Sequence, residues 1–137
     1  VGTAGTLAGM VAGLGVKSMP TEIIGIRVVP EAWLARSHVA ALCRATADAL
    51  GVNPGSWRLL DGFLGAGYGC ATSEGREAIR RAEEVGLALE CCYTGKALAA
   101  ALQVSEGPDL YWQTGSQRDL EPLLEGVDPV DRTAWGW

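Results

Sequence analysis

The chain has 137 residues, of which 48% are hydrophobic and 20% are charged, a composition that excludes a chain disordered throughout. Its 11 basic and 16 acidic residues give a net charge of −5, which argues against a broad nucleic-acid-binding surface. A local anion site built from backbone amides remains compatible with this charge. The length suits a single domain that can bury a sizeable core.

Cysteine and histidine usage gives no sign of a metal centre. The cysteines are Cys43, Cys70, Cys91 and Cys92, no CxxC spacing is present, and His38 is the only histidine. No tetrahedral zinc site is therefore predicted. No basic segment precedes the apolar start, so we expect no signal peptide and four free thiols in a reducing cytoplasm. Cys91 and Cys92 are expected to be buried packing residues.

The chain opens with a run of small and apolar residues, 1–16, in which Gly5, Gly9 and Gly13 recur at a spacing of four. This spacing is typical of packed membrane helices. The run ends at Lys17, however, and is shorter than the ~20 apolar residues that span a bilayer. We therefore expect a buried helix whose glycines allow close packing against a sheet, and no membrane segment.

Two strand signals and one helix signal follow. A β-branched segment ends at Pro30, and the next apolar residues recur with helical spacing as far as Gly51. Asn53-Pro54-Gly55 predicts a turn before a second short apolar run. The expected elements are a buried strand over 22–29, a helix over 30–50 and a strand over 57–63.

The second half of the sequence alternates in the same way. Thr72 or Ser73 can cap a helix that runs to about Val85 and ends at Gly86. The remaining expected elements are a short apolar segment over 87–89, an alanine-rich helix from 93–96 to Val104 and a last strand over 110–112. This alternation predicts an α/β fold with a parallel sheet and flanking helices, and we expect residues 1–137 to form one such domain.

Three loops carry residues that could do chemistry. Loop 2–6 (GTAGT) precedes the first expected helix, so its amides, its hydroxyls and the helix dipole can together hold a phosphate. A nucleotide-hydrolysing P-loop would also require a lysine, which this loop lacks. Taken alone, a glycine-rich turn before a helix more often has a structural role.

The other two loops each contain a tyrosine. Loop 65–69 (GAGYG) lies at an expected strand-to-helix junction, where α/β sheets bind ligands, although Tyr68 can also simply fill a turn. Tyr93 can transfer a proton if its surroundings lower its pKa, whereas the plainer interpretation is a tyrosine followed by the N-cap Thr94. Lys96 is interpreted as a solvated residue on a helix surface rather than a nucleophilic amine.

The order of these motifs resembles one enzyme family. The segments GTAGTLAG at 2–9, DGFLGAGYG at 61–69, TSE at 72–74 and YTGKA at 93–97 follow one another with matching spacing, and the likeness covers residues 1–115. The sequence is similar to the C-terminal half of the D-cysteine desulfhydrase and 1-aminocyclopropane-1-carboxylate (ACC) deaminase family. This resemblance implies pyridoxal phosphate as the cofactor and the tryptophan-synthase-β fold, also called fold type II.

The resemblance also implies a role for each loop. Tyr68 would face cofactor and substrate, Tyr93 would be a second active-site tyrosine for proton transfer or substrate contact, and Thr94 would lie against the pyridine nitrogen. The deaminase branch carries glutamate at this last position and the desulfhydrase-like branch carries threonine. A hydroxyl supports a weaker electron sink than a carboxylate, so Thr94 favours loss of a β-thiol with release of pyruvate and ammonia. The cofactor phosphate would be held by Gly2, Thr3, Ala4, Gly5 and Thr6.

The sequence departs from the family in three places. Residues 90–92 (ECC) replace the usual Asp-Pro pair, and residues 113–116 (QTGS) replace a His-Thr-Gly-Gly-like segment. Neither Lys17 nor Lys96 matches the Schiff-base lysine, which the family carries before the phosphate loop. We therefore expect the C-terminal portion of a longer, homo-oligomeric enzyme that deaminates or desulfhydrates a small amino acid. The alternative is a non-catalytic α/β module that self-associates or binds a phosphate-bearing ligand.

Overall fold

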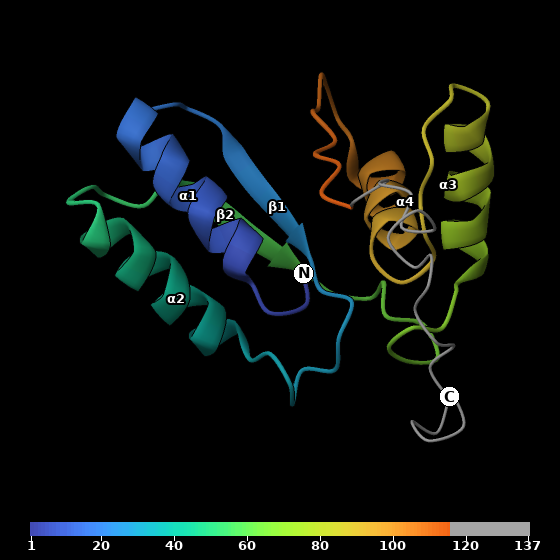
Figure 1. Cartoon of the computed structure of the whole chain (residues 1–137), viewed down its shortest axis with the longest axis horizontal. Coiled ribbons are helices and arrows are strands. Elements are labelled where there is room, and N and C mark those ends of the chain that lie inside the picture. Colours follow the sequence, from blue (N-terminus) through green and yellow to red (C-terminus); the bar gives the residue numbers. More distant parts are fainter. Residues whose placement is uncertain (116–137) are drawn as a thin grey trace, which may run out of the picture.

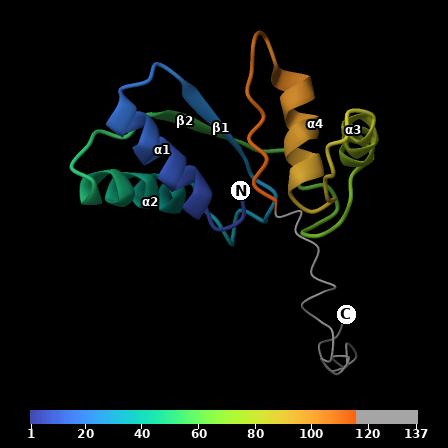
Figure 2. The same ribbon diagram turned by 45° about the horizontal axis from the view of Figure 1, so that its top comes forward.

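Two parallel strands lie between two pairs of helices. In the computed structural model, which describes residues 1–115, β1 (Glu22–Ile26) pairs in parallel with β2 (Ser56–Leu60). One helix pair consists of α1 (Gly5–Lys17) and α2 (Arg36–Ala49), and the other of α3 (Ser73–Glu83) and α4 (Thr94–Val104). The two pairs lie on opposite sides of the strands in both views (Figure 1, Figure 2). The predicted α/β fold with a parallel sheet and flanking helices is confirmed.

Both faces of the sheet are covered, because side chains alternate between the two helix pairs along each strand. Leu59 belongs to the hydrophobic core that α1 and α2 form, and Ile23 packs against that core. Ile26 belongs to a second core with Ala100 of α4, and Ile24 packs against it. The near-continuous apolar runs of the strands therefore result from burial on two sides.

α1 buries its larger residues against the rest of the fold, and Gly5, Gly9 and Gly13 lie on the opposite face. Its buried residues are Leu7, Ala8, Val11 and Ala12. Gly5, Gly9 and Gly13 are exposed, and a Cβ added to any of them would meet nothing within 4 Å. The expectation that these glycines allow close packing is therefore wrong: burial is favoured by apolar area, which the opposite helix face supplies. The close approach occurs near the end of α1, where a Cβ on Gly15 would collide with the Asn53 carbonyl oxygen and a Cβ on Gly55 would lie 2.6 Å from Leu14 Cβ.

Most element boundaries follow the sequence signals. Thr72 caps α3 by accepting a hydrogen bond from the Gly75 N–H at 3.0 Å, as predicted. α2 begins at Arg36 rather than near Pro30, because residues 31–33 form a separate turn. The strand predicted over 110–112 is wrong: among residues 1–115 this segment pairs with no strand, and it runs beside α4, where the Tyr111 hydroxyl donates to the Thr94 carbonyl. No helix in the described part of the chain has the length and apolarity needed to cross a membrane.

The start of the chain lies beside the carboxyl end of β1, where Figure 1 marks the N-terminus. The Val28 N–H donates to the Val1 carbonyl at 3.4 Å, and the Val1 nitrogen donates to the Ile26 carbonyl. Loop 2–6 therefore begins at the carboxyl edge of the sheet. Parallel α/β sheets bind their ligands at this edge, so the fold places the first candidate loop where a ligand is expected.

Candidate active site

Loop 2–6 turns sharply into α1. Ala4, the N-cap residue, is buried and has the left-handed angles φ 64 and ψ 1. Thr3, Gly5 and Thr6 are exposed, and none of their amides donates a hydrogen bond within residues 1–115. The first N–H groups of a helix have no carbonyl one turn earlier to pair with. These free amides, two hydroxyl groups and the positive end of α1 form a donor set that suits a phosphate.

Gly2 brings this loop into contact with a second one. A Cβ built on Gly2 would lie 3.1 Å from both the Cε1 atom and the hydroxyl oxygen of Tyr93. Tyr93 is the N-cap residue of α4. The absence of a side chain at Gly2 therefore lets the Tyr93 ring lie directly against loop 2–6.

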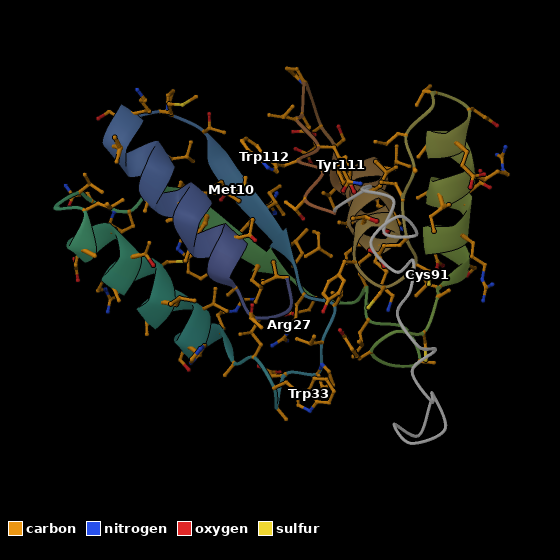
Figure 3. The ribbon with its side chains drawn as sticks, viewed as in Figure 1. Met10, Arg27, Trp33, Cys91, Tyr111 and Trp112 are labelled. Atoms are coloured by element: carbon orange, nitrogen blue, oxygen red, sulfur yellow. The ribbon has the colours of Figure 1, made fainter. Side chains whose placement is uncertain are left out.

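Tyr93 in turn contacts Tyr68 of loop 65–69. Their hydroxyl oxygens lie 2.6 Å apart, and their rings meet edge to face with centroids 5.8 Å apart. The ring of Trp33, labelled in Figure 3 in the loop after β1, lies 5.7 Å from the Tyr68 ring. Both tyrosines keep part of their surface accessible, 41% for Tyr68 and 38% for Tyr93. A ligand beside loop 2–6 could therefore reach both phenols.

The phenol of Tyr68 holds its proton tightly. The hydrogen bond with Tyr93 is the largest cause that raises the pKa of Tyr68, to about 12, and partial burial and the Cys92 thiol add to it. Tyr68 is therefore a proton donor at neutral pH, not a base. The 2.6 Å separation from Tyr93 gives that proton a short path to the second phenol.

A carboxylate organises the start of α4. Glu90 accepts hydrogen bonds from the backbone N–H groups of Cys92, Tyr93 and Thr94, at 2.5, 2.8 and 2.6 Å. Burial by itself would raise the pKa of Glu90, but these hydrogen bonds outweigh it and hold the pKa below its usual range. The N-cap position predicted for Thr94 is wrong, because Tyr93 occupies it and the Glu90 carboxylate supplies the capping acceptor.

Thr94 is the first residue of α4 and is only 5% exposed. Its hydroxyl accepts a hydrogen bond from the Glu90 N–H at 2.8 Å and lies 3.0 Å from Glu90 Oε1, to which it donates. The hydroxyl hydrogen is therefore already engaged, and one lone pair of the oxygen is left to accept. Tyr111, labelled in Figure 3, donates from its hydroxyl to the Thr94 carbonyl at 3.0 Å.

The two neighbouring cysteines are not the buried packing residues that the sequence predicts. Cys91 is exposed and Cys92 is half-buried. They lie in the turn that precedes α4, whose backbone is directed towards the Glu90 carboxylate, and this leaves their side chains near the surface. Neither these two cysteines nor Cys43 and Cys70 form a disulfide, so all four thiols are free as expected.

Lys96 is fully buried, at 0% exposed, and the expectation of a solvated side chain is wrong. Its Nζ donates to the carbonyl of Leu64 at 2.7 Å and to that of Gly67 at 3.3 Å. Ala99 and Ala100, three and four positions after Lys96 on the same helical face, are buried as well.

The structure thus brings Gly2, Tyr68 and Tyr93 into one contact group and places Thr94 next to it in the chain. No hydrogen bond joins Thr94 to loop 2–6 within the described part of the chain. Sequence reasoning missed Trp33 and Glu90. The acidic side chain just before a helix start is a recognisable capping signal for Glu90, whereas no local signal exists for Trp33.

Comparison with known proteins shows the family to which the chain belongs. A family model described as pyridoxal-phosphate dependent enzyme matches residues 1–109. The D-cysteine desulfhydrase of Yersinia enterocolitica is 36% identical over 124 residues, and that of Klebsiella pneumoniae 32% over 123 residues. Each of these alignments covers 83% of this chain and 38% of the relative, so the chain spans well under half of their length.

A solved structure shares the fold. The crystal structure of an ACC deaminase homologue superimposes with a TM-score of 0.68 at 30% sequence identity, covering 76% of this chain and 32% of the other. The family model, the desulfhydrase relatives and this structure agree with one another. The chain therefore belongs to the family of pyridoxal-phosphate dependent enzymes.

Proposed function

We propose that the chain is the phosphate-binding, C-terminal portion of a longer enzyme that uses pyridoxal phosphate to eliminate a group from a small amino acid. One observation carries this proposal: Gly2 contacts Tyr93, and Tyr93 contacts Tyr68, so the phosphate loop and both phenols lie together at the carboxyl edge of the sheet. The share of the relatives that the chain covers, 38%, supports the view that further chain completes the enzyme.

The residues present fit the phosphate group of the cofactor. Thr3, Gly5 and Thr6 offer amides without protein acceptors in the described residues, and the threonines add hydroxyl donors. A phosphate dianion is stabilised by such donors at the positive end of a helix. Loop 2–6 contains no lysine or arginine, so backbone donors carry the binding.

The rest of the site would serve proton transfer and orientation. Bound pyridoxal phosphate supplies an electron sink for the charge left when the α-proton departs. Tyr68, with its raised pKa, holds a proton that its hydroxyl can give to a departing group. Thr94 can offer only a lone pair to a ring nitrogen, because its hydrogen is donated to Glu90. A hydroxyl at this position, where the deaminase branch has glutamate, favours a D-cysteine-like substrate over an ACC-like one.

The direct test uses the longer protein that contains this chain, loaded with pyridoxal phosphate. We expect it to release sulfide and pyruvate from D-cysteine faster than it releases ammonia from ACC. Tyr68→Phe should lower kcat/KM by about 10²-fold or more, the usual contribution of a general acid. A loaded enzyme that turns over neither amino acid would overturn the proposal.

The chain by itself should not hold the cofactor covalently. Lys96 is buried, Lys17 lies at the far end of α1, and neither matches the family's Schiff-base lysine. We expect no stable visible absorption band after the chain is mixed with pyridoxal phosphate and the excess is removed. A stable band that disappears in Lys96→Ala would contradict this expectation.

One observation favours the alternative of a self-associating module. Leu110, Trp112 and Trp33 are 82%, 59% and 66% exposed, which is unusual for large apolar side chains. Homo-oligomerisation of this chain would cover them. Sedimentation velocity should then show a dimer or larger species, and a monomer at all accessible concentrations would exclude this alternative.

A further inference from the structure

Lys96 is buried in a setting that ordinarily disfavours a lysine. It is among the largest fully buried side chains, whereas Lys17, the only other lysine in the sequence, is exposed. Lysine is almost never fully buried without a partner charge, and within residues 1–115 no carboxylate forms an ion pair with it. It also lies in the first turn of α4, where the helix dipole disfavours positive charge.

The contacts of Nζ account for this placement. Its two acceptors, the Leu64 and Gly67 carbonyls, both belong to the segment that leads into Tyr68. The Gly67 carbonyl is part of the peptide group that joins Gly67 to Tyr68. Lys96 itself follows Tyr93 by one turn at the start of α4. One side chain therefore ties the backbone of Tyr68 to the helix that begins at Tyr93.

We propose that Lys96 is a positioning residue, which fastens segment 64–68 to α4 and thereby holds the Tyr68 hydroxyl against that of Tyr93. The inference rests on the proposed function for its catalytic meaning, because it concerns the two phenols assigned there. The anchor itself is a property of the chain without cofactor and can be tested in that state.

α3 lies over the lysine stem. A Cβ added to Gly75 would meet Lys96 Cγ at the ordinary van der Waals distance of 3.8 Å, so the backbone of α3 lies about one methyl group away from the lysine stem. A Cβ on Gly95 would lie 2.8 Å from Ile79 Cδ1, so the two helices approach more closely there than any larger residue permits. This packing excludes water from Nζ, and a hydrogen bond that water cannot replace holds the segment more firmly.

The experiment compares Lys96→Met with Lys17→Met in the full chain at neutral pH. Methionine keeps the length and apolar stem of lysine and removes the donor. Cross-peaks between the Tyr68 and Tyr93 ring protons, assigned with Tyr68→Phe, are the readout in NMR spectra. We expect these cross-peaks to be lost in Lys96→Met and kept in Lys17→Met, while cross-peaks within the α1–α2 core stay unchanged in both variants.

Retained Tyr68–Tyr93 cross-peaks in a folded Lys96→Met variant would overturn the proposal. A loss of cross-peaks that extends evenly over the α1–α2 core would also overturn it, since that result describes general destabilisation. If Lys96→Met does not fold, the wild-type spectrum decides: we expect a slowly exchanging ¹⁵Nζ signal for Lys96 with cross-peaks to segment 64–68. A Lys96 signal averaged by solvent, like that of Lys17, would overturn the proposal. None of these readouts depends on whether the longer protein is an enzyme.

Discussion

The hydroxyl groups of Tyr68 and Tyr93 lie 2.6 Å apart, although one belongs to a glycine-rich loop and the other to the start of a helix. Because this hydrogen bond is the largest cause that raises the pKa of Tyr68 to about 12, Tyr93→Phe should lower that pKa towards the ordinary value of 10.0. The near-ultraviolet absorbance of tyrosinate during an alkaline titration measures the change. Tyr111→Phe is the matched control, since it removes a phenol outside the pair. An unchanged Tyr68 pKa in Tyr93→Phe would show that the hydroxyls are not coupled.

Local patterns in the sequence predicted most of the elements, whereas the family resemblance grouped the three loops. Alternating strand and helix signals predicted the α/β fold, and Thr72 caps α3 as its position indicated. Loop 65–69 follows β2 and the chain start lies beside the end of β1, so Tyr68 and Gly2 reach one edge of the sheet, and the start of α4 brings Tyr93 to them.

The features that the sequence patterns did not predict depend on contacts between segments that are distant in the sequence. The burial of Lys96 requires carbonyls of segment 64–68, which no spacing within α4 reveals. The exposure of Gly9 follows from which face of α1 meets the sheet, and a spacing of four does not decide that. Strand pairing at 110–112 likewise needs a neighbouring strand, and the described residues provide none there.

The Glu90 carboxylate should stabilise the fold in a pH-dependent way. Its folded-state pKa lies below its ordinary value of 4.5, so its contribution is complete above that value and is lost as the pH falls through the folded pKa. Glu90→Gln should lower the free energy of unfolding by about 1 kcal/mol at neutral pH, as for other helix caps, and by much less near pH 3. Urea unfolding at both pH values measures this difference.

Glu83→Gln is the control for Glu90, because the Glu83 side chain forms no hydrogen bond or ion pair within residues 1–115. It should leave stability unchanged at both pH values. An equal cost of Glu90→Gln at neutral and acidic pH would exclude the carboxylate charge as the source of the stabilisation.

The close contact of α3 and α4 should make two glycines respond in opposite directions. Gly95→Ala places a Cβ 2.8 Å from Ile79 Cδ1, and overpacking of this kind typically costs about 1–3 kcal/mol. The Cβ of Gly9→Ala meets nothing within 4 Å on the exposed face of α1, so this variant should stabilise the fold by up to about 1 kcal/mol through helix propensity. Thermal unfolding measures the change in stability of each variant relative to the wild type. A Gly95→Ala variant as stable as Gly9→Ala would contradict the helix packing described above.

A half-buried ion pair joins the residues that follow β1 and β2, and it should contribute more to stability than a surface pair. Arg27, labelled in Figure 3, is only 9% exposed, and its Nε lies 2.6 Å from Asp61 Oδ1. Asp61→Asn should cost about 1–3 kcal/mol, because it leaves a largely buried guanidinium with only its longer, 3.5 Å ion pair to the exposed Glu31. The surface pair Arg58–Glu22 is the comparison, and Glu22→Gln should cost less than about 1 kcal/mol. Chemical denaturation measures both losses of unfolding free energy. Equal losses in Asp61→Asn and Glu22→Gln would show that the buried pair contributes no more than the surface pair.

The central claim is that loop 2–6 binds the phosphate of pyridoxal phosphate. The most direct measurement follows the amide NMR signals of the full chain while pyridoxal phosphate, or pyridoxal without the phosphate, is added. The account predicts that the signals of Thr3, Gly5 and Thr6 shift with pyridoxal phosphate and stay in place with pyridoxal. Shifts of equal size with both compounds, or shifts confined to residues away from loop 2–6, would contradict it.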